Sequence, residues 1–135
     1  MNAGCSGTPL ARKLGYAPGM RVHHVNAPDG FSDLVGELPD GVTVLRRVAD
    51  DVDLAILFVT RRRELEPGLA KLQRRLRPAG MLWVAWPKRA AKVPTDVTED
   101  VVRDVALPRG LVDVKVCAID DVWSGLKLVI RRELR

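Results

Sequence analysis

The sequence predicts a three-layer α/β/α sandwich whose sheet is mostly parallel and ends in an antiparallel hairpin. From residue 20 to residue 107, short apolar runs of strand length alternate with segments of helical periodicity. The last two apolar segments, 111–119 and 126–132, follow each other without a helical pattern between them and alternate apolar with polar residues. Alternating strands and helices favour a parallel sheet covered on both faces, and two consecutive amphipathic strands favour a hairpin at its edge.

The first part of the chain predicts a leading helix followed by two strands around a short helix. Residues 6–15 suit a helix, because serine or threonine beside a proline can cap its start and Gly15 suits a left-handed end. The short helix is weakened by Gly36 and closed before Pro39. The elements expected here are strand 20–26, helix 31–38 and strand 41–45.

The centre of the chain carries the clearest patterns. Residues 53–60 form a continuous apolar run, which is typical of a strand buried on both faces of a parallel sheet. The segment 64–77 repeats leucine at spacings of four, three and four residues, which gives one apolar stripe of a helix. After it we expect strand 81–86, a basic loop at 88–96, helix 98–107, and the hairpin strands joined through residues 120–125.

Length and composition predict one domain. With 135 residues the chain can bury about two-thirds of its unfolded surface around a single core. We therefore expect a single Rossmann-like domain over residues 1–135, with residues 1–18 as a helical lead-in. The N-terminus has neither a basic nor an apolar signal region and no run is long enough for a membrane span, so a cytoplasmic protein is expected. The two cysteines and two histidines share no motif, which disfavours a disulfide framework or a zinc site.

The positive charge of the chain raises the question of nucleic acid. The net charge is +5 and the pI about 9.7. Lysine and arginine release counterions from phosphates, so association through an arginine-rich surface is one alternative. Acidic residues are interspersed along the chain and only 4% of residues are aromatic, whereas RNA-binding surfaces usually pair cations with stacking aromatics. Solubility is the favoured explanation of the charge.

Two resemblances rest on longer motifs. Residues 51–84 resemble the second half of class I methyltransferases, because DVD at Asp51 leads into an apolar strand and LRPAG at Leu76 leads from a helix into the next one. Nearly the whole chain resembles a small uncharacterised bacterial family known as domain of unknown function 3052. That resemblance lies in SGTPLARKLG from Ser6, NAPDGF from Asn26, VAWPK from Val84, TEDVVRDVALPRGLVDVKV from Thr98 and WSGLKLV from Trp123. The resemblance to methyltransferases implies a Rossmann-like, methyltransferase-related topology. The resemblance to the uncharacterised family supports an expectation for the fold and suggests no activity.

The segments that hold a cofactor in methyltransferases differ in this chain. The first strand is followed by Asn26-Ala27-Pro28-Asp29-Gly30, whereas the family has a glycine-rich loop there that lets backbone N–H groups approach the ligand. Where the family's second strand ends in an acid that accepts from ribose hydroxyls, this chain has Arg46-Arg47, which only donate. The cofactor implied by the resemblance is S-adenosylmethionine or a nucleotide, and the arginines suit a phosphate.

Candidate site residues follow from the expected position of the strand ends. Ligands of open parallel α/β sheets bind beyond the carboxyl ends of the strands, and we expect the hairpin turn to lie nearby. The residues there offer an aromatic surface, cations, and hydroxyl or amide groups, which suit a small anion or a nucleotide. Each also has a structural explanation as a turn former, a core residue, a helix cap or a solvated cation. The candidates are Asn26, Asp29, Arg46, Thr60, Trp86, Lys88, Glu99, Trp123, Ser124 and Lys127.

Other chemically active residue types are explained by structure. His23 and His24 are adjacent in a strand, so their side chains face opposite sides and we expect both to be packed rather than catalytic. Cys117 is expected to be a small apolar filler of a strand. Ser124-Gly125 lacks the nucleophile elbow of serine hydrolases.

Three functions remain open at this stage. The first is a non-catalytic or regulatory domain that binds a small molecule or a protein partner at the strand ends. The second is an enzyme with a degenerate nucleotide or S-adenosylmethionine site, and the third is nucleic-acid association. The sequence assigns no metal, no membrane partner and no oligomeric state.

Overall fold

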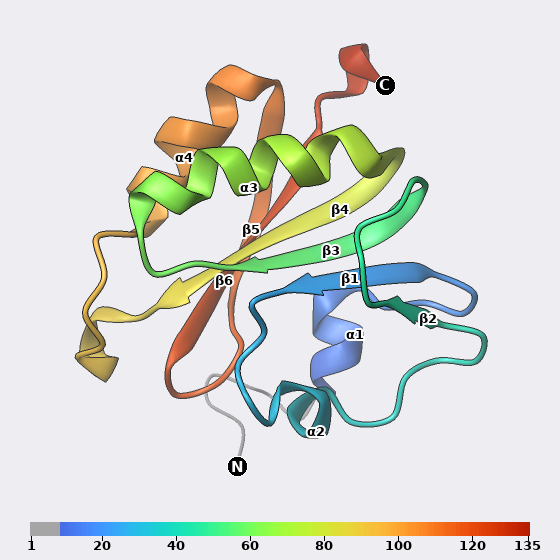
Figure 1. The fold of residues 1–135 in the computed structure, drawn as a ribbon, viewed down its shortest axis with the longest axis horizontal. Helices are drawn as coiled ribbons and strands as arrows, with labels where there is room; N and C mark the ends of the chain where they lie inside the picture. The colour runs from blue at the N-terminus through green and yellow to red at the C-terminus, as the bar shows by residue number, and fades with distance from the viewer. Residues whose placement is uncertain (1–8) are drawn as a thin grey trace.

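The structure is a computed structural model that describes residues 9–135. It contains a six-stranded sheet in the order β2-β1-β3-β4-β6-β5 (Figure 1). Strands β1 to β4 are parallel, and β6 is antiparallel to both of its neighbours, β4 and β5. The strands are β1 (Arg21–Val25), β2 (Thr43–Leu45), β3 (Val52–Phe58), β4 (Leu76–Pro87), β5 (Leu111–Ala118) and β6 (Trp123–Ile130). The predicted fold class, a mostly parallel sheet with a C-terminal antiparallel hairpin, is confirmed.

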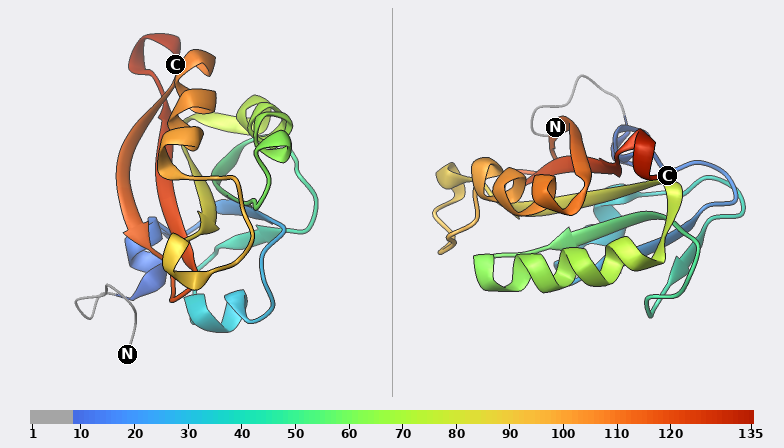
Figure 2. Two further views of the ribbon diagram at one scale, coloured as in Figure 1. Left: turned by 90° about the vertical axis from the view of Figure 1, so that its left-hand side faces the viewer. Right: turned by 90° about the horizontal axis from the view of Figure 1, so that it is seen from above.

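Helices cover both faces of the sheet. Helices α1 (Leu10–Leu14) and α2 (Phe31–Val35) lie on one face, and α3 (Arg62–Arg75) and α4 (Glu99–Ala106) lie on the other (Figure 2). Short 3₁₀ turns occupy Arg89–Ala91, Leu107–Arg109 and Arg132–Leu134. No helix of this described part is long and apolar enough to cross a membrane.

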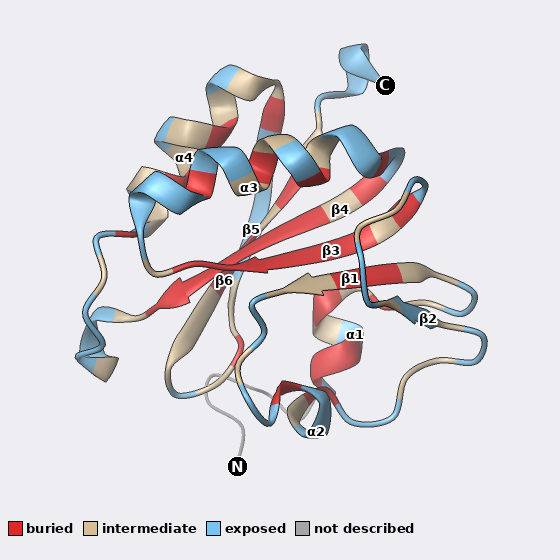
Figure 3. Cartoon of the chain, in the orientation of Figure 1, coloured by how far each residue is buried: buried red, intermediate tan, exposed pale blue. Residues whose placement is uncertain are grey.

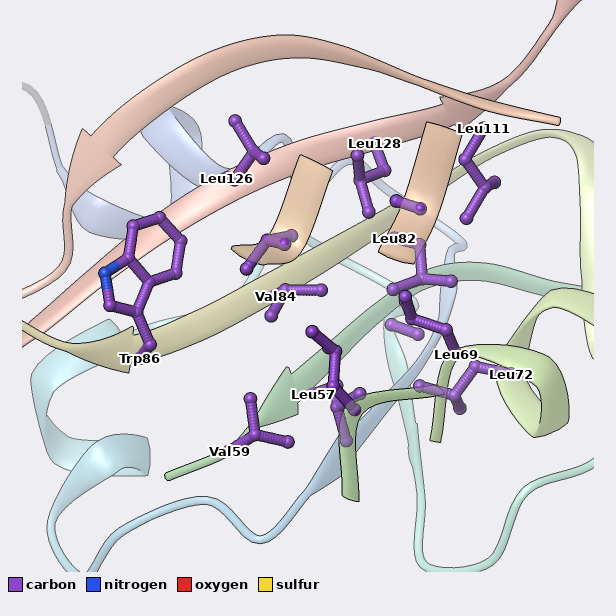
Figure 4. Close-up of a cluster of buried hydrophobic side chains, with 14 of the residues drawn as sticks. Leu57, Val59, Leu69, Leu72, Leu82, Val84, Trp86, Leu111, Leu126 and Leu128 are labelled. Carbon is purple, nitrogen blue, oxygen red and sulfur yellow. The ribbon is translucent and has the colours of Figure 1, made fainter. Parts of the chain in front are cut away.

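Each face of the central strands has its own hydrophobic cluster, and the strands between them are almost wholly buried (Figure 3). On the α3 side, Leu69 and Leu72 of the predicted leucine stripe pack with Leu57 and Val84 (Figure 4). On the α1 side, Leu14 and Trp83 are among the fully buried residues. The continuous apolar run of β3 is thus explained, because its successive side chains enter both clusters.

The end of α3 differs from the prediction. The helix stops at Arg75, and Leu76 is already extended and pairs with Val52 as the first residue of β4. Arg77 precedes Pro78, and a helical backbone conformation is unfavourable for a residue before proline. The helix therefore ends before Arg77. Leu76 remains buried as the stripe predicts, but as a strand residue.

The hairpin turn also lies earlier than predicted. Trp123, Ser124 and Gly125 belong to β6, where they pair with Pro87, Trp86 and Ala85 of β4. The turn is residues 119–122, and the Asp120 Oδ1 atom closes it by accepting from the backbone N–H groups of Val122 at 2.8 Å and Trp123 at 2.7 Å. An aspartate that bonds the backbone two residues on is a strong turn former, and it outweighs the glycine that suggested a later turn.

The two N-terminal helices are short. Helix α1 ends at Gly15, which has φ 97° as predicted, while Ser6 and Thr8, its proposed caps, lie outside the described residues. Helix α2 stops at Gly36 with φ 78°, three residues before Pro39, so Gly36 ends the helix rather than weakening it. Helix α4 begins as predicted, because the Thr98 hydroxyl accepts from the Val101 N–H at 3.2 Å.

The connection between β2 and β3 positions the main cavity. Parallel strands are usually joined by crossovers of a dozen or more residues that contain a helix, but here residues 46–51 suffice. This loop passes over β1 on the side of α3 (Figure 1). It is anchored there because Val48 packs against the core and the Asp50 carboxylate binds the Arg75 guanidinium at 2.8 Å. Without a helix in this connection, a space stays open between β1 and α3.

Candidate functional site

The cavity between β1, the 46–51 loop and α3 has a volume of about 570 Å³. It lies at the carboxyl ends of β1 and β2, where ligands of open α/β sheets bind. We call it the cationic cavity; its lining residues are His23, His24, Val25, Asn26, Arg46, Arg47, Val48, Leu57, Gly68, Lys71 and Leu72.

The charge of this cavity is of one sign. Arg46, Arg47 and Lys71 line it, and no aspartate or glutamate does. Within residues 9–135, no carboxylate comes within ion-pair distance of these three side chains. Their N–H donors are therefore available to an anion, and Val48, Leu57 and Leu72 add an apolar wall. A concave, partly apolar site with a few convergent polar groups has the composition of a small-molecule site.

The two histidines point to opposite faces, as predicted. His23 is buried beside the cavity and its Nδ1 donates to the Leu45 carbonyl oxygen at 2.8 Å. With Nδ1 as the donor of this bond, Nε2 is the other ring nitrogen that a ligand can contact. His24 faces α1 and α2 instead, where burial and the neighbouring His23 lower its pKa to about 4. Neither ring is arranged as half of a catalytic pair.

The turn after β1 is built by an asparagine. Asn26 has φ 60°, a left-handed conformation that asparagine tolerates better than most side chains, and Gly30 has φ 85°. Between them the chain offers no run of glycines to a ligand. Asn26 therefore contributes an exposed amide at the cavity rim in place of a glycine-rich loop.

A second cavity of about 300 Å³ lies on the other face of the same edge. Asp29 and Trp123, both predicted site residues, line it together with Phe31 and Phe58. We call it the aromatic cavity; its lining residues are Pro28, Asp29, Gly30, Phe31, Leu34, Phe58, Ile119, Asp120, Val122 and Trp123.

The remaining predicted residues are more scattered. Trp86 is buried and lines a third cavity of about 370 Å³ with Arg89 and Thr98. Thr60 supports the wall next to it through its carbonyl oxygen, which accepts from the Thr95 hydroxyl at 2.7 Å. A fourth groove of about 610 Å³ between α3 and α4 holds none of the predicted residues and mixes both signs of charge.

Besides Thr60, four predicted residues line none of these four cavities. The backbone N–H group of Lys88 donates to the Val122 carbonyl oxygen at 2.7 Å. Glu99 forms an ion pair with Arg103 on α4. Ser124 lies in the β4–β6 ladder opposite Trp86, and Lys127 pairs with Trp83 in the middle of the sheet. The structure thus divides the predicted site among several places.

Sequence reasoning missed Val48, Gly68 and Lys71 of the cationic cavity. Gly68 carried a signal, because a glycine next to the leucine stripe of a helix indicates a close neighbour. A Cβ atom at Gly68 would lie 2.8 Å from a methyl group of Leu57. The sequence around Lys71 gives no such signal, because lysine is common on the solvent-facing side of helices.

Comparisons with known proteins place this geometry in a wider context. No protein-family model and no curated protein matches the chain. Among solved structures, a SAM-dependent methyltransferase from Aquifex aeolicus superposes with a TM-score of 0.63 at 19% identity, covering 90% of this chain and 88% of that one. The fold is that of the methyltransferases. At this level of identity the similarity establishes the methyltransferase-like fold alone.

Two further solved structures share this fold. The ribosomal protein L11 methylase from Lactobacillus delbrueckii subsp. bulgaricus gives a TM-score of 0.58 at 11% identity, covering 91% of this chain and 76% of that one. Fibrillarin from Aeropyrum pernix, solved with natively bound S-adenosyl-L-methionine, gives a TM-score of 0.58 at 12% identity, covering 93% of this chain and 70% of that one. The methyltransferase-related topology implied by residues 51–84 is thereby confirmed, while the resemblance to domain of unknown function 3052 stays a prediction.

Proposed function

We propose that this methyltransferase-like domain binds an anionic nucleotide in the cationic cavity. The observation that carries the proposal is the set of three cations, Arg46, Arg47 and Lys71, at the carboxyl ends of β1 and β2 without a carboxylate among the lining residues. The similarity to methyltransferases supports an enzyme with a nucleotide or S-adenosylmethionine site over the non-catalytic role that the sequence alone favours, and the charge of the cavity decides between these two ligands.

The lining residues divide between the parts of a nucleotide. Arginine presents a planar fork of N–H donors that matches phosphate, so Arg46 and Arg47 would hold the phosphate with Lys71 opposite them. Leu57, Leu72 and Val48 form the apolar wall against which a base would pack. Asn26 and the Nε2 atom of His23 would form hydrogen bonds with ribose hydroxyl groups.

S-Adenosylmethionine is the second candidate, because the structural relatives include a protein solved with that molecule bound. Methyl transfer depends mostly on positioning of donor and acceptor, so it requires no particular catalytic side chain. Against it, a sulfonium cation would meet three cations in this cavity and no acid. The charge of the cavity therefore favours the phosphorylated ligand.

Calorimetric titration with ADP and with S-adenosylmethionine separates the two candidates. We expect ADP to bind, and the exchange of Arg46→Gln, Arg47→Gln or Lys71→Gln to weaken it by about tenfold each, since each removes a charge-assisted hydrogen bond. Arg74→Gln is the matched control, because Arg74 is an exposed arginine of α3 that does not line the cavity.

Each other result has a definite meaning. Binding of S-adenosylmethionine without ADP would replace the proposal by the second candidate, to be followed by an assay for methyl transfer. An equal loss of affinity in the Arg74→Gln variant would show general charge attraction instead of a site. Absence of heat with both ligands would overturn the proposal.

A further inference from the structure

The aromatic cavity has the opposite charge to the cationic cavity. Two carboxylates, Asp29 and Asp120, line it, and no lysine, arginine or histidine does, although the chain carries a net charge of +5. The two cavities lie on opposite faces of the sheet and approach each other where β1 ends, at Asn26 and Pro28. The same edge of the sheet thus presents one environment for anions and another for cations.

Three aromatic side chains line this second cavity: Trp123 is partly exposed, and Phe31 and Phe58 are buried behind it. The rings of Phe31 and Phe58 meet edge to face with centroids 5.1 Å apart, and those of Phe58 and Trp123 meet in the same way at 5.2 Å. These contacts fix three rings that come from α2, β3 and β6. The face of an aromatic ring attracts a cation through its quadrupole, most strongly for tryptophan.

The two carboxylates belong to different turns of the chain. Asp120 is held by the hairpin turn, where its Oδ1 atom accepts from two backbone N–H groups, and the turn itself is tied to β4 through Lys88 and Val122. Asp29 belongs to the turn that enters α2, which is closed by the bond from the Phe31 N–H to the Pro28 carbonyl oxygen at 3.1 Å. Within the described chain neither carboxylate forms an ion pair.

We propose that the aromatic cavity binds an organic cation, a small ligand whose apolar body carries a protonated amine or a quaternary ammonium group. The rings would contact the apolar body, and Asp29 and Asp120 would balance the charge. A cavity lined by aromatic rings and two carboxylates, without a cationic side chain among its lining residues, favours a positively charged ligand, because an anion would be repelled and a neutral polar group would gain less there. This inference stands independently of the nucleotide in the other cavity.

Phenethylamine and its neutral analogue 2-phenylethanol test the charge requirement with one shape. Titration of the isotope-labelled protein, followed by amide NMR shifts, should place phenethylamine at residues 28–31 and 119–123. We expect 2-phenylethanol to bind at least about tenfold more weakly, because it lacks the charge that the carboxylates would balance. Equal affinity of the two compounds, shifts confined to other residues, or no shifts at millimolar amine would overturn the proposal.

Variants test the two carboxylates without disturbing the turns. In the double variant Asp29→Asn and Asp120→Asn, the amide that replaces the Asp120 carboxylate keeps an oxygen that can accept from the same N–H groups, so the fold is preserved. We expect this variant to bind phenethylamine at least about tenfold more weakly. The control variant Asp33→Asn and Asp121→Asn changes the net charge equally at two exposed residues outside the cavity and should bind normally. Equal affinity in both double variants would contradict the assignment.

Discussion

The hydroxyl group of Tyr16 lies 2.5 Å from the Nε2 atom of His24, and the two rings are held between α1 and β1. Because a phenol and a neutral imidazole can each donate or accept, this bond joins the two groups in their uncharged forms. Phe31 stacks edge to face on the His24 ring with centroids 5.1 Å apart. Burial raises the pKa of Tyr16 and lowers that of His24 to about 4, so the pair stays neutral across the physiological range.

This pair predicts a loss of stability in weak acid. His24 takes up a proton near pH 6.5 in the unfolded chain but only near pH 4 in the folded one. Because the unfolded state binds more protons between these values, the free energy of unfolding falls as the pH falls from 6.5 to 4. The full shift corresponds to about 3 kcal/mol, and partial exposure of the ring reduces the expected loss to about 1–2 kcal/mol.

Urea denaturation at several pH values checks this prediction in the wild type and in His24→Gln. The glutamine keeps an oxygen that can accept from Tyr16 but has no proton to gain. We therefore expect the variant to have a flatter pH dependence over that range. Parallel curves for the two proteins would show that other groups cause the acid sensitivity.

A buried hydrogen bond joins β4 to the end of α1. The Trp83 Nε1–H donates to the Leu14 carbonyl oxygen at 2.8 Å, and both residues are fully buried. Trp83→Phe removes the N–H donor, so the buried Leu14 carbonyl oxygen loses this hydrogen bond. We therefore expect the free energy of unfolding to fall by about 1–3 kcal/mol. Trp86→Phe is the control, because Trp86 is a buried tryptophan of the same strand whose indole N–H forms no hydrogen bond within the described chain. Equal losses in the two variants, measured by urea denaturation, would assign the effect to packing.

The elements that the sequence predicts best are those whose patterns are local. The apolar run of β3 and the leucine stripe of α3 are recognisable because burial on both faces or on one face leaves a period in the sequence. The predicted position of the hairpin turn is wrong because Asp120 closes the chain through side-chain bonds that compete with the glycine signal. The change from helix to strand at Leu76 requires knowledge of its partner Val52, which no local pattern supplies.

The candidate site is predictable only in part, for a topological reason. Asn26 and Arg46 are expected at strand ends and do line one cavity, while Asp29 and Trp123 line another. The cavity that Arg46 and Asn26 line exists because the loop 46–51 contains no helix. The sequence shows that this loop is short, but it does not show over which face of the sheet the loop passes. A cation from α3, Lys71, joins the cavity only because that loop leaves space above β1.

Gly125 is predicted to be intolerant of a side chain. It is buried in β6, and a Cβ atom there would lie 3.1 Å from the Trp83 ring and 3.2 Å from Ile119. A buried aromatic ring fixed by a hydrogen bond cannot move aside cheaply, so Gly125→Ala should lower the free energy of unfolding by about 1–3 kcal/mol. Ser124→Ala in the adjacent, half-buried position serves as the control, and an unchanged stability of Gly125→Ala in urea denaturation would contradict the packing argument.

Two lysines oppose each other across the hairpin, and this arrangement predicts a stabilising substitution. Lys115 of β5 pairs with Lys127 of β6, and the pKa of Lys127 is lowered by burial and further by Lys115. Like charges directly opposite on a sheet are destabilising, so Lys115→Glu should replace repulsion by attraction and add about 0.5–1 kcal/mol to the free energy of unfolding. The gain should shrink at high salt because Lys115 is exposed. Lys92→Glu makes the same change in net charge at an exposed loop residue, and an equal gain there would show that only the total charge matters.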